Sequence, residues 1–268
     1  MLTAPVMFDP LPVTGAWTAL PAMAPVPGLG ALPINGFLWK GPEPMLVDTG
    51  AGFLAAEWLA ALEQAIDPAD IRWVWLSHMD ADHVGNLHAL MARAPAARIL
   101  TNGLGYAKMQ LLGLPADRVD LLEPGKAFVA GGRTFHPIRP PYYDAPETTG
   151  FFDPVDRVLF AADAFGALLA EPYEEAAEIP QAALREGLLA WASIDAPWLG
   201  QVDAAKLGRT LAAIERLDPA AVLVGHLPVS RGNVRRLTRI IARAYGQGLE
   251  TVPDGLSIER LLDLPEAA

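Results

Sequence analysis

Strands and helices alternate along most of the chain, and the spacing of the apolar residues indicates where each lies. In the stretch "DIRWVWLSH", Ile71, Trp73 and Trp75 fall on one side of an extended chain, while Val74 and Leu76 fall on the other. This pattern predicts a strand over 70–78. Apolar residues at helical spacing predict helices over 53–66, 84–94, 103–113 and 203–218.

The remaining strands come mostly in pairs that are joined by turn residues. Two strands are predicted within 34–52, and hairpins over 126–140 and 149–166. Single strands are predicted over 97–102 and 220–226. The first thirty residues are rich in Pro and Gly and are predicted to form a loop that leads into a strand. Residues 170–200 are predicted to form helices and a covering loop.

This alternation predicts the fold class. No linker or break in composition divides the chain, so we expect a single α/β (α+β) domain over residues 1–268. The GLG triplet at 28–30 is not interpreted as a dinucleotide fingerprint, since no strand clearly precedes it and Pro33 stands where the helix would continue.

The composition disfavours several classes of protein. The 268 residues carry a net charge of −11, and an acidic chain is repelled by phosphate backbones, so nucleic acid is a poor partner. No long apolar run predicts a membrane span, and no basic residue precedes Lys40, as a secretory signal would require. Without Cys there is no disulfide, thiolate metal site or Cys nucleophile, and a cytoplasmic location is expected.

Basic residues are concentrated near the C-terminus, in a predicted last helix over 230–248. Their spacing is helical over Arg231, Arg235, Arg236, Arg239 and Arg243. A run of this kind is usually a solvated helix face. The alternative is a docking patch for an acidic partner protein.

The densest chemistry lies in "HMDADH", at the end of the predicted strand over 70–78. It places His78, Asp80, Asp82 and His83 within six positions. Carboxylates this close repel one another unless cations lie between them. Strand ends are also where a rigid scaffold brings side chains to one point. The cluster therefore predicts a metal site.

The order and spacing of such residues resemble the metallo-β-lactamase superfamily. "HMDADH" resembles the family motif H-x-[HED]-x-D-H, and "LVDTG" (46–50) resembles the strand before it. "DRVLFAADAFG" (156–166) resembles the strand that delivers the metal-bridging aspartate, and "VLVGH" (222–226) the one that delivers the last histidine. The resemblance implies an αββα sandwich with a dinuclear site at one edge of the sheets.

The carboxylate at Asp80 narrows the resemblance to one group within the superfamily. Most hydrolases of the superfamily carry His there, whereas a carboxylate is typical of flavodiiron proteins and their oxygen-binding diiron relatives. The segment 141–166 is also similar to the flavodiiron segment P-x-x-H-W-P-D-…-D-P-…-L-F-…-D-A-F-G. In departure from that family, Asp80 replaces Glu and Asp144 replaces His, and we do not expect the flavodoxin domain that normally follows.

The resemblance implies two metal sites. The first would use His78, Asp80, Asp144 and Asp163, and the second would use Asp82, His83, Asp163 and His226. Asp163 would bridge metals about 3.5 Å apart. Oxygen-rich ligation at the first site suits Fe, or else Mn, better than Zn.

Alternatives remain open for single residues. Glu147 rivals Asp144 as a ligand, and Asp80 could face solvent beside a single metal. Asp48 is expected to orient a ligand His rather than to bind metal. His88 is expected to lie at the surface or behind a ligand, and His136 is expected in a packed or edge position. Four aromatic residues are candidates to wall the pocket: Tyr143, Phe165, Trp191 and Trp198.

Two functions fit these residues. The first is a non-haem diiron protein that binds or reduces O2, NO or peroxide, with electrons from a separate flavoprotein or rubredoxin-like donor. The alternative is a hydrolase in which Asp82 orients a metal-bridging hydroxide towards an ester, amide or phosphoester. The carboxylate at Asp80 favours the first, and the expected absence of a flavodoxin domain favours the second. The sequence leaves the oligomeric state open, with a homo-oligomer among the options.

Overall fold

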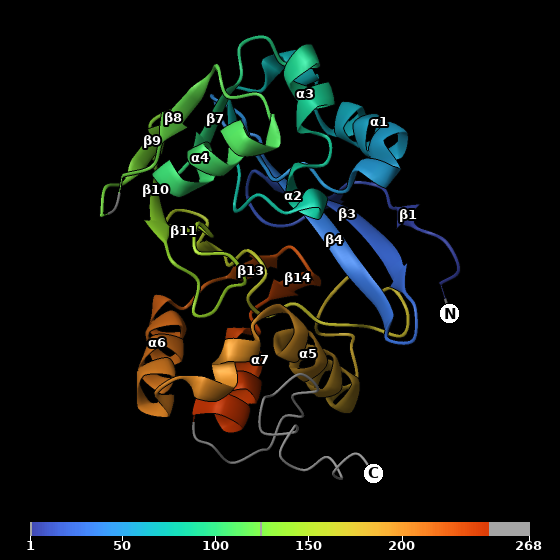
Figure 1. Ribbon diagram of the computed structural model, residues 1–268, viewed down its shortest axis with the longest axis vertical. Helices are drawn as coiled ribbons and strands as arrows, with labels where there is room; N and C mark the ends of the chain where they lie inside the picture. Colours follow the sequence, from blue (N-terminus) through green and yellow to red (C-terminus); the bar gives the residue numbers. More distant parts are fainter. Residues whose placement is uncertain (1, 124, 247–268) are drawn as a thin grey trace, which may run out of the picture.

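Two β-sheets pack face to face in this protein, and helices cover the outer side of each (Figure 1). The computed structural model describes residues 2–123 and 125–246. The N-terminal half supplies the first sheet and the C-terminal half supplies the second. This layer order is the αββα sandwich that the resemblance implies, so the predicted fold class is confirmed.

Each sheet mixes parallel and antiparallel neighbours. The first has the order β1 (Val6–Met7), β3 (Trp17–Val26), β4 (Gly30–Trp39), β5 (Met45–Val47), β6 (Trp73–Trp75), β7 (Arg98–Thr101), β8 (Val119–Leu121), with β2 (Leu11–Pro12) also pairing with β3. The second has the order β14 (Leu227–Arg231), β13 (Ala221–Val224), β12 (Val158–Phe160), β11 (Gly150–Asp153), β10 (Arg133–Ile138), β9 (Phe128–Ala130). Strands β5 to β8 are parallel, as are β12 and β13.

Helices form the two outer layers and the connections at the sheet edges. Those that follow strands of the first sheet are α1 (Ala55–Ala65), α2 (Ala81–Val84), α3 (Leu87–Arg93) and α4 (Gly103–Leu112). The second sheet is covered by α5 (Gln181–Asp195), α6 (Ala204–Leu217) and α7 (Val234–Ile241). Short helical turns are η1 (Gly52–Leu54), η2 (Pro68–Asp70), η3 (Pro197–Gln201) and the π-helical η4 (Ala242–Gly246). None of the helices in the described part of the chain has the length and apolar composition of a membrane span.

An aromatic core fills the space between the two sheets. Phe37, Trp75, Phe151 and Phe160 are fully buried there, with Leu223 from β13. Burying one such side chain stabilises a fold by roughly 1.5–3 kcal/mol. Both sheets are therefore apolar on the face that they share.

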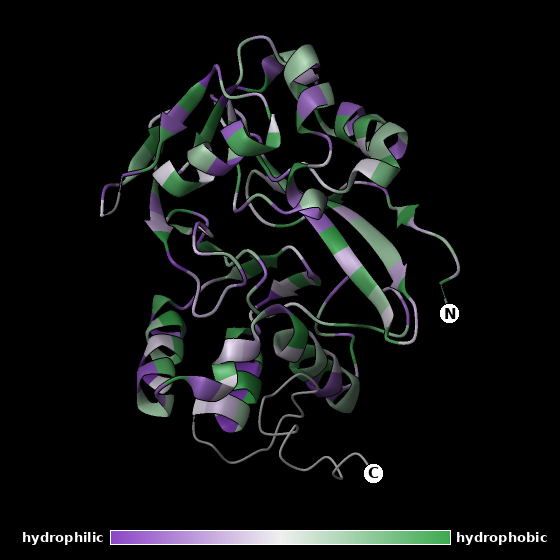
Figure 2. Cartoon of the chain, viewed as in Figure 1, coloured by the Kyte–Doolittle hydropathy of each residue, from purple (hydrophilic) through white to green (hydrophobic). Residues whose placement is uncertain are grey.

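The outer faces of the sheets bury the alternate positions of the same strands. Leu46 and Val74 face α1 and α3, while their neighbours Val47 and Trp75 face the second sheet. Leu159 in β12 likewise packs in the outer core with helices α5 to α7. In Figure 2 the helices of both outer layers carry hydrophobic and hydrophilic residues together, as expected of helices that bury one face.

The loop prediction for the first thirty residues is wrong. They contain β3, a ten-residue strand that pairs with β4 along its whole length. Pro21 and Pro25 obscure it, because proline lacks the N–H that a sheet ladder uses. The backbone of Pro21 faces the side of β3 that is turned away from β4. There the amide of Phe8 donates to the Pro21 carbonyl at 2.9 Å. Within residues 2–123 and 125–246, the strands that pair on that side are the two-residue β1 and β2, so the missing donors cost little.

The helix predicted over 84–94 begins later, at Leu87 as α3, and Gly85 and Asn86 separate it from the short helix α2, which ends at Val84. A Cβ on Gly85 would lie 2.3 Å from the amide nitrogen of Gly52, so only glycine allows the 48–52 loop to approach. Asn86 Nδ2 donates to the carbonyl oxygens of Thr49 at 2.7 Å and Ala51 at 3.2 Å. The loop that begins at Asp48 is thereby fixed against the "HMDADH" segment.

Most other predicted elements are present with altered bounds. The strand predicted over 70–78 is ordered as β6 over three residues only. Strand β14 was not predicted, and the last helix begins at Val234 instead of 230. Residues 247 and 248 of that prediction lie outside the described residues. The missed strand returns the chain along β13 immediately after His226, and this tight return was hidden by the Arg-rich pattern that follows it.

Candidate metal centre

Strand ends from both sheets meet at one edge of the sandwich and carry the polar residues singled out in the sequence. Asp48 follows β5, and His78 follows β6. Asp163 and His226 follow β12 and β13 in the second sheet. Because β5 and β6 are parallel, and β12 and β13 are too, their carboxyl ends point to a common edge.

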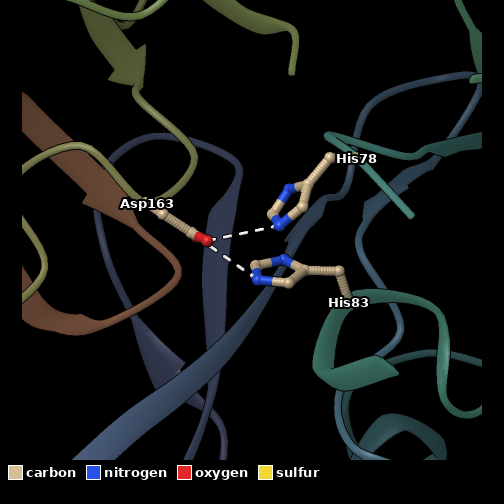
Figure 3. A group of neighbouring side chains, drawn as sticks. All are labelled: His78, His83 and Asp163. Atoms are coloured by element: carbon tan, nitrogen blue, oxygen red, sulfur yellow. Dashed lines mark ion pairs between the residues drawn. The ribbon is translucent and has the colours of Figure 1, made fainter. Parts of the chain in front are cut away.

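Asp163 lies at the middle of this cluster. Its Oδ2 is 3.3 Å from His78 Nε2, and its Oδ1 is 3.3 Å from His83 Nε2 (Figure 3). His226 Nε2 lies 3.5 Å from Oδ2. All four side chains are buried. A carboxylate that faces imidazoles with both oxygens has the arrangement that a bridging ligand requires.

The Asp163 loop is held in a costly backbone conformation. Ala162 and Phe165 have φ angles of 48° and 71°, in the left-handed region that non-glycine residues rarely adopt. The amide of Phe165 donates to Tyr142 Oη at 2.6 Å, and the amide of Gly225 donates to the carbonyl of Ala162 at 2.8 Å. Such strain is common where a side chain must be placed for function.

Beside Asp163, one group of side chains matches the implied second metal site. Asp82 Oδ2 lies 3.4 Å from His226 Nε2 and 3.8 Å from His83 Nε2. Asp82 and His83 lie on α2, which begins at Ala81, after the short loop that follows β6. The structure thus brings together all the side chains predicted for this site.

A second group matches the implied first site. Ligand atoms of His78, Asp80 and Asp144 all lie within 4.8 Å of one another, and His78 Nε2 is 3.8 Å from Asp144 Oδ2. Asp80 is the exposed member. Asp195, which the sequence did not single out, joins them: its carboxylate lies within 4.8 Å of those of Asp144 and Asp163.

Hydrogen bonds behind the imidazoles determine which ring nitrogen faces the centre. His226 Nδ1 lies 2.7 Å from the carbonyl of Pro33, which can only accept, so Nδ1 carries the proton. His83 Nδ1 donates likewise to Asp48 Oδ2 at 2.9 Å. Ser77 Oγ donates to the same Asp48 oxygen at 2.7 Å and therefore accepts from His78 Nδ1 at 2.9 Å. All three Nε2 atoms are left to face Asp163, the tautomer that a metal ligand needs.

Asp48 thus has the contacts of an orienting residue, and its own position is constrained. Its Oδ1 accepts from the amide of Ser77 at 2.8 Å, and its backbone φ is 56°. The carboxylate is 1% exposed and faces the backs of the rings, away from the group around Asp163. The predicted outer role of Asp48 remains a prediction, but the geometry that it needs is present.

The electrostatics of the cluster call for added positive charge. Burial lowers the pKa of His226, but Asp163 and Asp82 outweigh it and raise the pKa to about 9. Burial likewise opposes protonation of His83, yet Asp163, Asp82 and Asp48 hold its pKa well above its usual range. Despite burial, the imidazoles of His83, His226 and His78 hold the pKa of Asp163 well below its usual range. Protons on the imidazoles therefore balance the carboxylates when no metal does.

The pKa values of Asp195 and Asp80 are raised, whereas the pKa of Asp163 is lowered. Burial and the neighbouring carboxylates of Asp163 and Asp144 raise the pKa of Asp195 to about 8. Burial also raises the pKa of Asp80, although His78 opposes it. These carboxyls share a region that lacks enough cations to keep all of them ionised.

The donor atoms fit a pair of metal ions. Among the described residues, His78 Nε2, His83 Nε2 and Asp163 Oδ1 are buried and have no hydrogen-bond partner. Donors bound at about 2.1 Å to one tetrahedral ion lie about 3.4 Å apart. The nitrogen–oxygen distances from these imidazoles to Asp163 and Asp144 are 3.3–3.8 Å.

Gly225 provides the space in which the centre fits. A Cβ at this position would lie 2.7 Å from Asp163 Oδ1 and 2.8 Å from His83 Cε1. Asn35 fixes the same turn, since its Nδ2 donates to the carbonyls of Val224 at 3.0 Å and Leu227 at 2.7 Å. Sequence reasoning missed both residues, because their roles depend on which loops meet.

Other residues weighed in the sequence lie elsewhere. Glu147 is buried, but its Oε1 pairs with Lys108 Nζ at 2.6 Å, and it belongs to none of the groups around Asp163. His88 and His136 are exposed, and neither belongs to the groups around Asp163. Of the aromatic candidates, Trp191 packs against the ring of His226 with centroids 4.6 Å apart, so it lines the cluster at this histidine. Neither Ser77 nor Asp195 was singled out in the sequence analysis.

Two hollows lie away from the candidate ligands. The larger, about 610 Å³, is lined by Pro33 and Asn35 behind His226, with Met23, Tyr173 and Glu174 among its other residues. The smaller, about 310 Å³, lies between α5 and α7. It is lined by Gln181, Arg185, Arg236, Arg239, Ile240 and Arg243. No residue predicted to bind metal lines either hollow.

This fold with its cluster of His and Asp at the sheet edge defines a class of protein, and the sequence agrees. The chain belongs to the metallo-beta-lactamase superfamily, whose sequence pattern matches residues 32–226. Within it, the fold is that of the lactamase-like core of flavodiiron proteins.

Two individual relatives show this similarity in their sequences. A rubredoxin-oxygen oxidoreductase of Megalodesulfovibrio gigas is 28% identical over 192 residues, which cover 70% of this chain and 45% of that protein. A type A flavoprotein of Rhodobacter capsulatus is 28% identical over 137 residues, 50% of this chain and 32% of that protein. The matches span less than half the length of these curated relatives.

Solved structures extend the likeness over nearly the whole chain. The rubredoxin oxygen:oxidoreductase from Desulfovibrio gigas superposes with a TM-score of 0.77 at 20% identity, covering 89% of this chain and 61% of that one. The flavodiiron protein from Giardia intestinalis gives a TM-score of 0.78 at 18% identity, covering 90% and 60%. At these identities the likeness establishes the fold.

Proposed function

We propose that this chain is a dinuclear non-haem iron protein that binds or reduces dioxygen, nitric oxide or peroxide with electrons from an external donor. One observation carries the proposal: the first site offers one imidazole, His78, with the carboxylates of Asp80 and Asp144 and the shared Asp163. Hard oxygen donors suit Fe or Mn, whereas Zn prefers nitrogen and sulfur. The relatives include a rubredoxin-oxygen oxidoreductase and a flavodiiron protein, and this likeness supports the same class.

The proposed ligands are divided between two ions. The first ion is held by His78, Asp80, Asp144 and Asp163, and the second by Asp82, His83, Asp163 and His226. Two iron ions held there would supply reducing electrons and open positions for a small molecule. Manganese and zinc are the alternatives that metal analysis must exclude.

The chain's own groups orient these ligands and limit access by water. Asp48 and Ser77 keep the imidazoles of His78 and His83 in one tautomer. Trp191 covers the ring of His226. Asp82 is the partly exposed carboxylate, 29% accessible, beside His226 and is placed to accept a proton from a molecule that enters from solvent.

An external donor needs a surface on which to dock. The smaller hollow, between α5 and α7, is the candidate, because Arg239 and Arg243 line it in a chain of net charge −11. Arg236 also lines it, but its guanidinium donates to the carbonyls of Ala176 at 3.1 Å and Ile179 at 2.6 Å. Arg231 is excluded from the predicted patch, since it lies on β14, pairs with Glu175 and donates to the carbonyl of Val13 at 2.8 Å. An acidic flavoprotein or rubredoxin-like protein has the complementary charge.

Metal content and small-molecule reactivity test the proposal together. Protein from cells supplied with iron, manganese and zinc is analysed by elemental mass spectrometry. The reduced protein is then mixed anaerobically with O2 or NO while its spectrum is followed. We expect about two irons per chain and spectral changes with both gases. Asp163→Asn is the control, and it should abolish both signals.

Two outcomes would contradict the proposal. Reactivity that survives in Asp163→Asn would come from adventitious iron. Zinc retained after reconstitution with ferrous iron, together with hydrolysis of ester or phosphoester substrates, would instead support the hydrolase.

A further inference from the structure

We propose that Asp195 is an additional ligand of the first metal, so that this site has one imidazole and four carboxylates. The inference rests on the proposed dinuclear centre and concerns a residue outside the metal-binding motifs. Asp195 is the last residue of α5, an outer helix of the second sheet. Its carboxylate nevertheless lies within 4.8 Å of those of Asp144 and Asp163.

The position of Asp195 is electrostatically unfavourable without a cation. The C-terminal end of a helix carries partial negative charge and disfavours a carboxylate. The last turn of α5 contains no basic residue. Two further carboxylates face Asp195, and its Oδ2 is buried without a hydrogen-bond partner among the described residues. Helix stability alone therefore does not explain an aspartate here.

Independent atoms point to a ligand at the same place. His78 is fully buried, and its Nε2 has no hydrogen-bond partner in the described part of the chain. That nitrogen lies 3.3 Å from Asp163 Oδ2 and 3.8 Å from Asp144 Oδ2. The two carboxylates that meet Asp195 are thus the two that flank an unpartnered imidazole lone pair.

Local packing holds Asp195 in this place. The turn η3 begins two residues after it, and there Trp198 Nε1 donates to the carbonyl of Tyr143 at 2.9 Å. The rings of these two residues also pack, with centroids 5.3 Å apart. Since Tyr143 precedes Asp144, these contacts fasten the end of α5 to the Asp144 loop. A position fixed in this way is preorganised for ligation.

A fourth carboxylate changes what the site prefers. Five carboxylates around two ions, those of Asp80, Asp82, Asp144, Asp163 and Asp195, exceed the charge of two divalent cations. Excess negative charge and hard oxygen donors favour trivalent iron and disfavour zinc. Asp195 would therefore act on metal choice and oxidation state.

Cobalt titration of the full chain, stripped of metal and kept anaerobic, tests this inference. We compare wild type with Asp195→Asn and with Asp218→Asn, an aspartate that follows the neighbouring helix α6 and pairs with Arg157. In Asp195→Asn, one of two Co²⁺ ions should bind at least about tenfold more weakly, as ligand-shell losses do. The visible bands of that ion should shift, and the other ion should bind as in wild type. Asp218→Asn should match wild type throughout.

Thermal melting of the metal-free protein separates ligation from a structural role. Asp195→Asn removes like-charge repulsion, so the metal-free variant should melt at a higher temperature than wild type. Unchanged cobalt affinities, or a lowered melting temperature accompanying lost affinity, would overturn the inference.

The outcome is distinguishable from failure of the proposed function. Cobalt binding depends on neither iron preference nor O2 reactivity. A chain that binds two Co²⁺ through Asp195 but does not hold iron would contradict the proposed function and leave this inference intact. Unaltered cobalt affinities in Asp195→Asn, with iron bound and reactive, would contradict this inference and leave the proposed function intact.

Discussion

The two sides of Asp163 differ in both chemistry and support. On one side, the imidazole-rich side, His83 and His226 meet Asp82. On the other, the carboxylate-rich side, His78 meets Asp80 and Asp144, and Asp195 joins through Asp144 and Asp163. The three imidazoles are at most 2% exposed, whereas Asp144 is 20% exposed.

This difference follows from where each side chain originates. His226 follows a buried strand, and the imidazoles are held from behind by Asp48, Ser77 and the carbonyl of Pro33. The aspartates of the carboxylate-rich side come from a helix start, a loop and a helix end. The imidazole-rich side is therefore supported by hydrogen bonds behind its rings, whereas the carboxylate-rich side is assembled from three separate segments.

Removing the shared residue should have the largest effect, because it belongs to both sides. Asp163→Ala is expected to weaken both metals by more than about 100-fold, beyond the 10–100-fold typical of outer partners. Elemental analysis after dialysis, with circular dichroism to confirm folding, measures this loss. If one metal stayed fully bound, Asp163 would not bridge.

Loss of the support behind the imidazoles should come next. Asp48→Asn replaces the acceptor that His83 uses directly and His78 reaches through Ser77. We expect both metals to bind about 10- to 100-fold more weakly. Ser77→Ala should affect only the metal held by His78. Stepwise cobalt titration of the two variants distinguishes them, and identical effects would mean that Ser77 does not relay the contact.

The imidazole-rich side was also the more predictable from sequence. The segments "HMDADH" and "VLVGH" contain all the residues that make up this side with Asp163, namely Asp82, His83 and His226, and both segments stand at the ends of predicted strands. Asp195 could not be found this way, since it ends an amphipathic helix and reaches the centre only through the contact of Trp198 with Tyr143. Long-range packing of this kind has no local periodicity. The same limit hid β3, whose prolines are tolerated only because of what pairs beside them.

Filling the space between the loops should disturb the imidazole-rich side selectively. In Gly225→Ala, the added methyl would meet Asp163 Oδ1 and His83 Cε1 at less than 3 Å. Overpacking of this kind costs about 1–3 kcal/mol. We expect lower stability and weaker binding of the second metal. Gly103→Ala, where no atom lies within 4 Å of the added carbon, is the control for denaturant unfolding. Equal stability of the two variants would contradict the close packing at Gly225.

Converting a carboxylate to an imidazole should reduce the contrast between the sides. Asp144→His adds a nitrogen donor to the first site, and we expect the preference for zinc over iron to rise several-fold, a factor of about 3–10. Competition between the two metals, read by elemental analysis, measures the change. Glu147→Gln is the matched control, because Glu147 pairs with Lys108 instead. A shift with Glu147→Gln but not with Asp144→His would exchange the roles of the two residues.

The smallest effect should be the pH dependence of the metal-free protein. His226 has a pKa of about 9 when folded, against about 6.5 when unfolded. Its contribution to stability is therefore complete below pH ~6.5 and is lost as the pH rises towards ~9. Asp195, with a folded pKa of about 8, binds its proton more tightly in the folded state, so it also makes stability fall, between pH ~4 and ~8.

Melting curves between pH 5 and 9.5 should show these two groups separately. The metal-free wild type should lose a few degrees of melting temperature across this range. Asp195→Asn should flatten the acidic part of the decline and leave the part above pH ~7, where His226 titrates. Metal ions replace the imidazole protons, so the loaded protein should show no such decline. A metal-free protein that gained stability with rising pH would contradict the charge balance on which the two sides of Asp163 are distinguished.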